Sequence, residues 1–146
     1  MRFAAGVDVG STQTKAVVME AGVGIAARAL VDTGANVTKA AEHAFHLACD
    51  DARIKPHDVG FVVGTGYGRY RITFGNAQMT EISCHARGAS YVFPSTRTVI
   101  DMGGQDAKAT SIGEDGQVHD FVMNDKCAAG PGRFLANAAD VMGITL

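Results

Sequence analysis

Residues 7–16 read Val7-Asp8-Val9-Gly10-Ser11-Thr12-Gln13-Thr14-Lys15-Ala16. The same pattern returns at residues 100–109, which read Ile100-Asp101-Met102-Gly103-Gly104-Gln105-Asp106-Ala107-Lys108-Ala109. The two stretches align without a gap and share aspartate, glycine, lysine and alanine, whereas about one identity is expected by chance at ordinary residue frequencies. Each stretch lies between apolar runs. The sequence therefore predicts two copies of one β-hairpin, in which a strand ends near an aspartate, a glycine permits a tight turn, and a second strand returns.

Phosphate binding is the chemistry that the first hairpin favours. Backbone N–H groups in a tight turn can surround phosphate oxygens, and a nearby carboxylate can hold Mg²⁺ through water. Asp8 is a candidate catalytic residue, and the candidate phosphate-binding residues are Gly10, Ser11, Thr12, Gln13, Thr14 and Lys15. The alternative is an ordinary polar β-turn with a solvated lysine.

The second hairpin carries the same kinds of group. Gly103 and Gly104 allow the backbone to approach a phosphate closely. Gln105 is the candidate for orienting an attacking water, and either Asp101 or Asp106 for holding Mg²⁺ or acting as a base. Positioning and charge neutralisation carry most of phosphoryl transfer. The sequence leaves open which carboxylate has which role, and a plain tight turn is again the alternative.

Around the hairpins, the periodicity of apolar residues and the turn residues predict an α/β order. Asn36 is the expected N-cap of the first helix, Thr80 of the second, and Gly143 the C-terminal cap of the third. The expected strands are 3–9, 14–20, 23–31, 59–63, 98–101, 107–112 and 118–123, and the expected helices are about 37–53, 80–92 and 131–142. An Asp-Gly hairpin turn is expected at 114–117.

Composition excludes several classes of protein. The chain has 146 residues, of which 47% are hydrophobic and 19% charged, so a packed core is expected rather than disorder. The net charge of −2 gives no sign of a nucleic-acid-binding surface, and no stretch resembles a membrane-spanning helix. The first expected strand begins at residue 3, so we expect no signal peptide and a cytoplasmic protein. Three widely spaced cysteines do not indicate a disulfide framework.

Five motifs in one order carry a resemblance to a known family. They are Asp8-Val9-Gly10-Ser11-Thr12-Gln13-Thr14-Lys15, the glycine loop 64–69 (Gly-Thr-Gly-Tyr-Gly-Arg), residues 81–89 (Glu-Ile-Ser-Cys-His-Ala-Arg-Gly-Ala), residues 100–106, and residues 124–130 followed by Gly132-Arg133-Phe134. The chain resembles the ATPase activators of 2-hydroxyacyl-CoA dehydratases and the ATPase subunits of ATP-dependent benzoyl-CoA reductase, the BadF/BadG/BcrA/BcrD type. The two hairpins resemble the phosphate loops of the wider actin, sugar kinase and heat-shock chaperone ATPase superfamily.

The resemblance implies a ribonuclease-H-like α/β fold with a first lobe at residues 1–95 and the first half of a second lobe at 96–146. ATP with Mg²⁺ is expected between the lobes. A [4Fe–4S] cluster is expected to be shared between two activator-type subunits, as a homodimer or heterodimer, with Cys127 as one ligand. Ferredoxin or flavodoxin is the expected electron donor, and a CoA-thioester dehydratase or reductase the expected acceptor. Because family members are longer, we expect the chain to be the N-terminal part of such a protein, although completion by a partner chain also fits.

Other interpretations remain open at this point. A small-molecule kinase of the same superfamily would use both hairpins but have no use for Cys127, and an inactive fragment would bind neither ATP nor a cluster. The glycine loop 64–69 is either a nucleotide or partner contact or a crossing that needs positive φ angles. Cys49 is expected in the core. Adjacent Cys84 and His85 point about 100° apart on a helix, so core packing and helix contact are expected rather than a shared metal.

Overall fold

The computed structural model describes residues 2–103, 106–124 and 131–145. The chain divides into two compact units, Met1–Glu81 and Ile82–Leu146. Each unit contains one sheet and at least one helix, which confirms the predicted α/β class. The predicted division into lobes at residues 1–95 and 96–146 concerns the complete ATPase fold and stays a prediction. No helix in the described part of the chain is long and apolar enough to cross a membrane.

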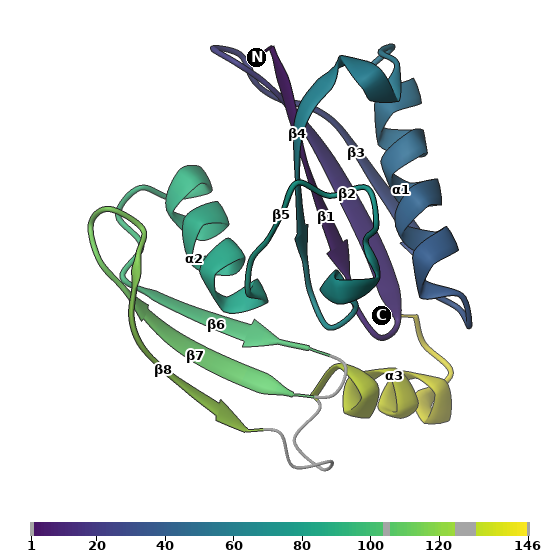
Figure 1. Cartoon of the computed structure of the whole chain (residues 1–146). Helices are drawn as coiled ribbons and strands as arrows, with labels where there is room; N and C mark the ends of the chain where they lie inside the picture. The colour runs from purple at the N-terminus through teal and green to yellow at the C-terminus, as the bar shows by residue number, and fades with distance from the viewer. Residues whose placement is uncertain (1, 104–105, 125–130, 146) are drawn as a thin grey trace. The chain divides into compact units, whose positions relative to one another are not determined.

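The first unit is built on a five-stranded sheet with the order β3-β2-β1-β4-β5 (Figure 1). The strands β1 (Phe3–Val9), β2 (Gln13–Glu20) and β3 (Gly24–Asp32) form an antiparallel meander. The strands β4 (Val59–Thr65) and β5 (Ala77–Gln78) extend the sheet from β1 in parallel. The predicted meander is therefore confirmed, and β1 lies at the centre of the sheet with antiparallel and parallel partners on its two sides.

Helix α1 (Val37–Asp51) covers one face of this sheet and packs against β1, β2 and β3 (Figure 1). Its predicted N-cap is confirmed, because the side chain of Asn36 accepts a hydrogen bond of 3.0 Å from the backbone N–H of Lys39. The helix ends two residues earlier than predicted, since Ala52 is its C-cap and Arg53 has a φ of 57°. The core is formed by alternate strand residues, by helix residues that are small apart from Phe45, and by Ile72 after η2 (Arg69–Arg71): Phe3, Ala5, Val7, Val9, Ala16, Val18, Ala41, Ala44, Phe45, Ala48, Cys49, Val62 and Ile72.

Three short elements of the first unit were not predicted. They are the 3₁₀ helices η1 (Pro56–Asp58) and η2 (Arg69–Arg71) and the strand β5. Each has two or three residues, which is too short for a period of apolar residues to appear in the sequence.

The second unit contains a three-stranded antiparallel sheet in the order β6-β7-β8. Its elements are α2 (Glu81–Val92), β6 (Thr98–Met102), β7 (Ala107–Ile112), β8 (Val118–Asn124) and α3 (Pro131–Met142). The predicted turn before β8 is confirmed, with Gly116 at a φ of 73°. Gly143 has a φ of 65° just after α3, as predicted for a C-terminal cap.

Candidate functional site

The turn between β1 and β2 forms the first candidate site. Asp8 faces Lys15 across the two strands, and the Lys15 ammonium nitrogen lies 3.4 Å from Oδ2 of Asp8. The backbone N–H of Gly10 donates a 3.0 Å hydrogen bond to the carbonyl of Gln13 and so closes the turn. A Cβ at Gly10 would lie 2.8 Å from that same carbonyl oxygen, so the turn requires glycine there. Residues 11–13 between them are exposed, which leaves their backbone and side-chain groups open to a ligand.

The turn between β6 and β7 repeats this geometry. Asp101 faces Lys108 across the strands. The backbone N–H of Gly103 donates a 2.9 Å hydrogen bond to the carbonyl of Asp106. A Cβ at Gly103 would lie 2.6 Å from Oδ1 of Asp106. The two stretches that align in the sequence therefore fold into turns closed by the same hydrogen bond, and both place an aspartate opposite a lysine.

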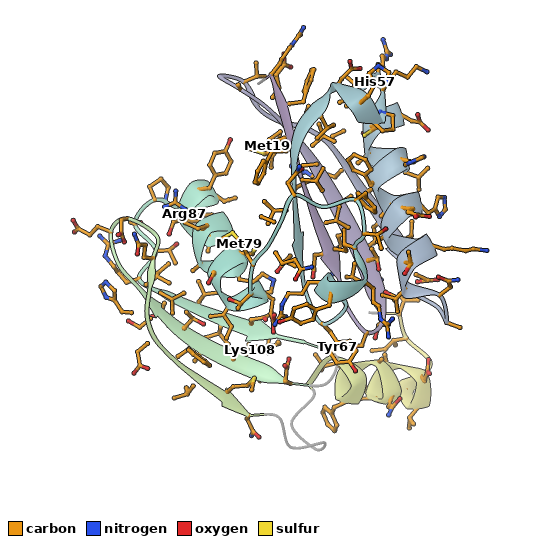
Figure 2. The ribbon with its side chains drawn as sticks, in the orientation of Figure 1. Met19, His57, Tyr67, Met79, Arg87 and Lys108 are labelled. Carbon is orange, nitrogen blue, oxygen red and sulfur yellow. The ribbon has the colours of Figure 1, made fainter. Side chains whose placement is uncertain are left out.

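The two lysines differ in their surroundings. Lys108, labelled on β7 in Figure 2, has a side chain only 5% exposed, and its ammonium nitrogen lies 2.6 Å from Oδ2 of Asp106 and 3.9 Å from Oδ2 of Asp101. The side chain of Lys15 is 51% exposed. The Lys108 charge is thus committed to neutralising carboxylates of its own hairpin, while the Lys15 charge is available to an incoming anion.

His85, which was expected to serve in core packing and helix contact, lies at the second hairpin. Nδ1 of His85, on α2, is 3.0 Å from Oδ2 of Asp101. No pattern in the sequence indicates this pair, because 16 positions separate the two residues and no periodicity links them. Asp101 therefore lies close to two basic side chains, His85 and Lys108.

Two threonines, Thr14 and Thr33, stabilise the first turn through hydrogen bonds. Thr33 Oγ1 donates a 2.8 Å hydrogen bond to the carbonyl of Gly10 and lies 2.9 Å from Thr14 Oγ1. Since the single Thr33 hydroxyl proton goes to Gly10, Thr14 is the donor to Thr33. Thr14 is fully buried, so its observed role is to hold the turn; its predicted contact with phosphate stays a prediction. The contribution of Thr33 to this turn was not predicted. Thr33 follows β3 in the chain, and it lies next to the turn only because β3 pairs with β2.

The glycine loop after β4 packs against the end of β1. Gly66 has a φ of 85°, and a Cβ there would lie 2.3 Å from Oδ1 of Asp8 and 2.6 Å from the carbonyl of Val9. The backbone N–H of Gly68 donates a 2.8 Å hydrogen bond to the carbonyl of Val9. Arg69 donates hydrogen bonds to the carbonyl of Gly66 at 3.0 Å and to Glu81 at 3.3 Å. Gly66 therefore meets both the conformational and the spatial requirement for glycine, and it borders the Asp8 carboxylate.

Three of the predicted site residues, Gly104, Gln105 and Cys127, lie outside the described residues. In the chain, the described residues on either side of Cys127 are Asn124, the end of β8, and Pro131, the start of α3. In α3, the backbone N–H of Gly132 donates a 3.3 Å hydrogen bond to the carbonyl of Gly103. Within residues 2–103, 106–124 and 131–145, no group of three or more histidine, cysteine, aspartate or glutamate side chains could hold a metal ion. Cys49 is fully buried, as predicted, and burial raises the pKa of its thiol, with smaller effects from Asp50 and Asp58.

Comparison with known proteins identifies close relatives. The family model described as "BadF/BadG/BcrA/BcrD ATPase family" matches residues 5–146. The activator of lactoyl-CoA dehydratase from Anaerotignum propionicum is 42% identical over 144 residues, which cover 99% of this chain and 55% of the relative. The chain thus spans about half the length of the curated relatives it matches.

Solved structures agree with the sequence relatives. The (R)-2-hydroxyglutaryl-CoA dehydratase component A from Acidaminococcus fermentans matches with a TM-score of 0.91 and 40% identity, over 99% of this chain and 56% of that one. The activator of the 2-hydroxyisocaproyl-CoA dehydratase from Clostridium difficile, with bound ADPNP, matches with a TM-score of 0.89 and 38% identity, over 98% of this chain and 53% of that one. A hexokinase from Thermus thermophilus shares only the fold, at a TM-score of 0.58 and 15% identity, over 80% of this chain and 47% of that one. The predicted actin and sugar kinase type of α/β fold is confirmed.

Proposed function

Because the chain belongs to the BadF/BadG/BcrA/BcrD ATPase family, we propose that it forms part of an ATP-hydrolysing activator that drives electrons into a CoA-thioester dehydratase or reductase. The observation that carries the proposal is the repeated turn, in which the N–H of Gly10 and of Gly103 closes an Asp-and-Lys hairpin at 3.0 Å and 2.9 Å. The relatives support the proposal, because they are activators of CoA-thioester dehydratases and the structure of one of them contains a bound ATP analogue.

The first hairpin suits the binding of a phosphate group. Its exposed residues 11–13 present backbone amides and polar side chains, and the half-exposed Lys15 supplies a positive charge. The hydrogen bonds from Thr14 to Thr33 and from Thr33 to the carbonyl of Gly10 fix the turn, so that ligand binding does not require the turn to rearrange. Preorganised donors of this kind stabilise the charge on a transferring phosphoryl group without a reorganisation cost.

Mg²⁺ fits the carboxylates that the structure describes. This ion keeps several water ligands and takes one or two carboxylates together with substrate phosphates. Asp8 and Asp101 are each about one-quarter exposed, and each lies one residue before the end of the strand that leads into a turn. We propose that Asp8 holds a water ligand of the ion at the first hairpin, that Asp101 has the matching role at the second hairpin, and that Asp106, fixed by Lys108, and Gln105 orient the water that attacks the γ-phosphate. Bound Mg²⁺ would neutralise the developing phosphate charge.

We propose that Cys127 supplies one thiolate ligand to a [4Fe–4S] cluster shared with a second activator-type subunit. In the sequence, Cys127 stands four positions before Pro131, the first residue of α3. The N-terminus of a helix favours negative charge, which suits a thiolate-bound cluster. Ferredoxin or flavodoxin is the proposed electron donor, and the cytoplasm the proposed location.

The two alternatives lead to different observations. A small-molecule kinase would hydrolyse or transfer the γ-phosphate without iron; the likeness to hexokinase shows the fold alone and does not favour this function. An inactive module would bind no nucleotide.

The test uses the full-length gene product, purified without oxygen. Mg²⁺-dependent ATP hydrolysis, bound iron, and loss of that iron in Cys127→Ser with hydrolysis retained are the expected results. Hydrolysis without any iron would favour the kinase. No hydrolysis and no heat of Mg-ATP binding in calorimetry would refute the proposal and favour the inactive module.

A further inference from the structure

A row of three polar side chains crosses the sheet just before the first turn. Asp8 on β1 faces Lys15 on β2, and on its other side it pairs with Thr65 on β4. Side chains at facing positions of neighbouring strands lie on the same face of a sheet. Val7 and Val9, on either side of Asp8, are fully buried in the core that α1 covers, so this row lies on the opposite face.

Thr65 has an unexplained feature within this row. The residue is only 8% exposed, and its buried hydroxyl has no hydrogen-bond partner among the residues that the structure describes. A buried hydroxyl without a partner costs free energy, and a leucine or valine would avoid that cost. An unsatisfied polar group of this kind calls for a specific explanation.

The Asp8 carboxylate, which is next to Thr65 in the sheet, is a candidate partner for the Thr65 hydroxyl. Lys15 approaches Oδ2 of the carboxylate at 3.4 Å, and Gly66 closes off the side of Oδ1. Thr65 directly precedes Gly66 and shares a ladder position with Asp8. The second hairpin has the same arrangement with a different third partner, because Asp101 lies opposite Lys108 and 3.0 Å from Nδ1 of His85. In each hairpin, then, the aspartate has a facing lysine and one further polar neighbour.

We propose that Thr65 is a positioning residue of the first phosphate-binding turn, whose hydroxyl hydrogen-bonds to the Asp8 carboxylate when that carboxylate holds a water ligand of Mg²⁺ bound to nucleotide phosphate. The bond fixes the rotamer of Asp8 and keeps its remaining lone pairs directed at the water. This inference rests on the proposed function of the turn. It explains the presence of a hydroxyl at a buried position where none of the residues that the structure describes is its hydrogen-bond partner.

The test compares Thr65→Val, which keeps the branched shape and removes the hydroxyl, with Thr65→Ser, which keeps the hydroxyl. Both are made in the full-length gene product. In Thr65→Val, the Mg²⁺ concentration for half-saturation should rise about tenfold, the value for one hydrogen bond to a charged group. Binding of ATP in the presence of EDTA should not change, and Thr65→Ser should restore the Mg²⁺ dependence.

The melting temperature without ligand shows whether Thr65 positions Asp8 or instead stabilises the fold. Thr65→Val should melt at or above the temperature of the wild type, because it removes an unsatisfied buried hydroxyl. A lower melting temperature, together with weaker nucleotide binding both with and without Mg²⁺, would assign Thr65 to structure and overturn the inference.

Calorimetric titration with MgADP and with ADP in EDTA distinguishes this inference from the proposed function. If the wild type binds neither, both are refuted. If the wild type binds MgADP more tightly than ADP, and Thr65→Val shows the same difference, only the role of Thr65 is refuted. If that difference shrinks in Thr65→Val and returns in Thr65→Ser, the inference holds even for a protein that does not hydrolyse ATP.

Discussion

The ammonium group of Lys108 lies 2.6 Å from the Asp106 carboxylate, and the lysine side chain is 95% buried. Its counterpart in the first hairpin, Lys15, is half-exposed and 3.4 Å from Asp8. Two residues at the same position of a repeated hairpin thus serve different purposes. Lys108 stabilises its turn, whereas Lys15 remains available to a ligand.

Replacing the two lysines with methionine should therefore separate stability from binding. Lys108→Met leaves Asp106 without its partner and should lower the free energy of unfolding by about 2–3 kcal/mol, less than for a fully buried pair because the carboxylate is partly hydrated. Lys15→Met should change the free energy by less than about 1 kcal/mol, yet weaken ATP binding. Urea denaturation followed by circular dichroism, with calorimetry of Mg-ATP binding, measures both. Equal loss of stability in the two variants would contradict this interpretation of the pair.

Gly66 and Gly22 provide a matched test of the glycine loop. Both have positive φ angles, 85° and 76°, but a Cβ at Gly66 meets Asp8 and Val9, while one at Gly22 meets nothing within 4 Å. Gly22→Ala should cost about 1 kcal/mol, from conformation alone. Gly66→Ala should cost distinctly more and should also weaken Mg-nucleotide binding, because the side chain displaces the Asp8 carboxylate. Similar stability and binding in the two alanine variants would show that the loop tolerates the displacement.

The repeated hairpin could be predicted from the sequence because its signals are local. An apolar alternation, a glycine at the turn and an aspartate before it lie within ten residues, and both turns form as expected. The N-cap at Asn36 was predictable for the same reason. The period of apolar residues also predicts the strand Phe3–Val9 and the helix that covers it.

Contacts between distant parts of the chain were not predictable in this way. Thr33 reaches the carbonyl of Gly10 only because β3 returns beside β2, and His85 meets Asp101 only because the fold brings α2 close to the end of β6. Burial was not predictable from the repeat either. Val7 is fully buried in the core that α1 covers, whereas Ile100, at the same position of the second copy, is 71% exposed.

The threonine pair behind the first turn gives a third prediction. Thr33→Val removes the donor to the carbonyl of Gly10 and leaves the fully buried Thr14 hydroxyl without its acceptor. The free energy of unfolding should fall by about 1–3 kcal/mol, the cost of unsatisfied buried groups. Thr33→Ser retains both hydrogen bonds and should lose less than half as much. Urea denaturation of the two variants measures the difference, and a Thr33→Val protein as stable as Thr33→Ser would exclude this role for the hydroxyl.

The cysteines should differ in their reactivity toward an alkylating reagent. Cys49 is fully buried, and burial raises the pKa of its thiol, so little thiolate is present and the reagent has no access. Cys84 is only partly buried. Alkylation with iodoacetamide, located by peptide mass spectrometry, should modify Cys84 well before Cys49 in the native protein and both at similar rates in urea. Rapid modification of Cys49 in the native state would show that α1 opens readily.

The same thiol should contribute to the pH dependence of stability. The pKa of Cys49 is higher in the folded protein, so the folded state holds the proton more tightly than the unfolded chain does. The contribution of Cys49 to the free energy of unfolding is constant at pH values below the pKa of the thiol in the unfolded chain, which is about 8.5. The contribution falls as the pH rises above that value, because the thiol ionises first in the unfolded chain. Subtracting the free energies of unfolding of Cys49→Ala from those of the wild type between about pH 7 and 10 isolates the effect. The difference should be flat at first and then decline; a difference that rises with pH would mean that the folded protein favours the thiolate.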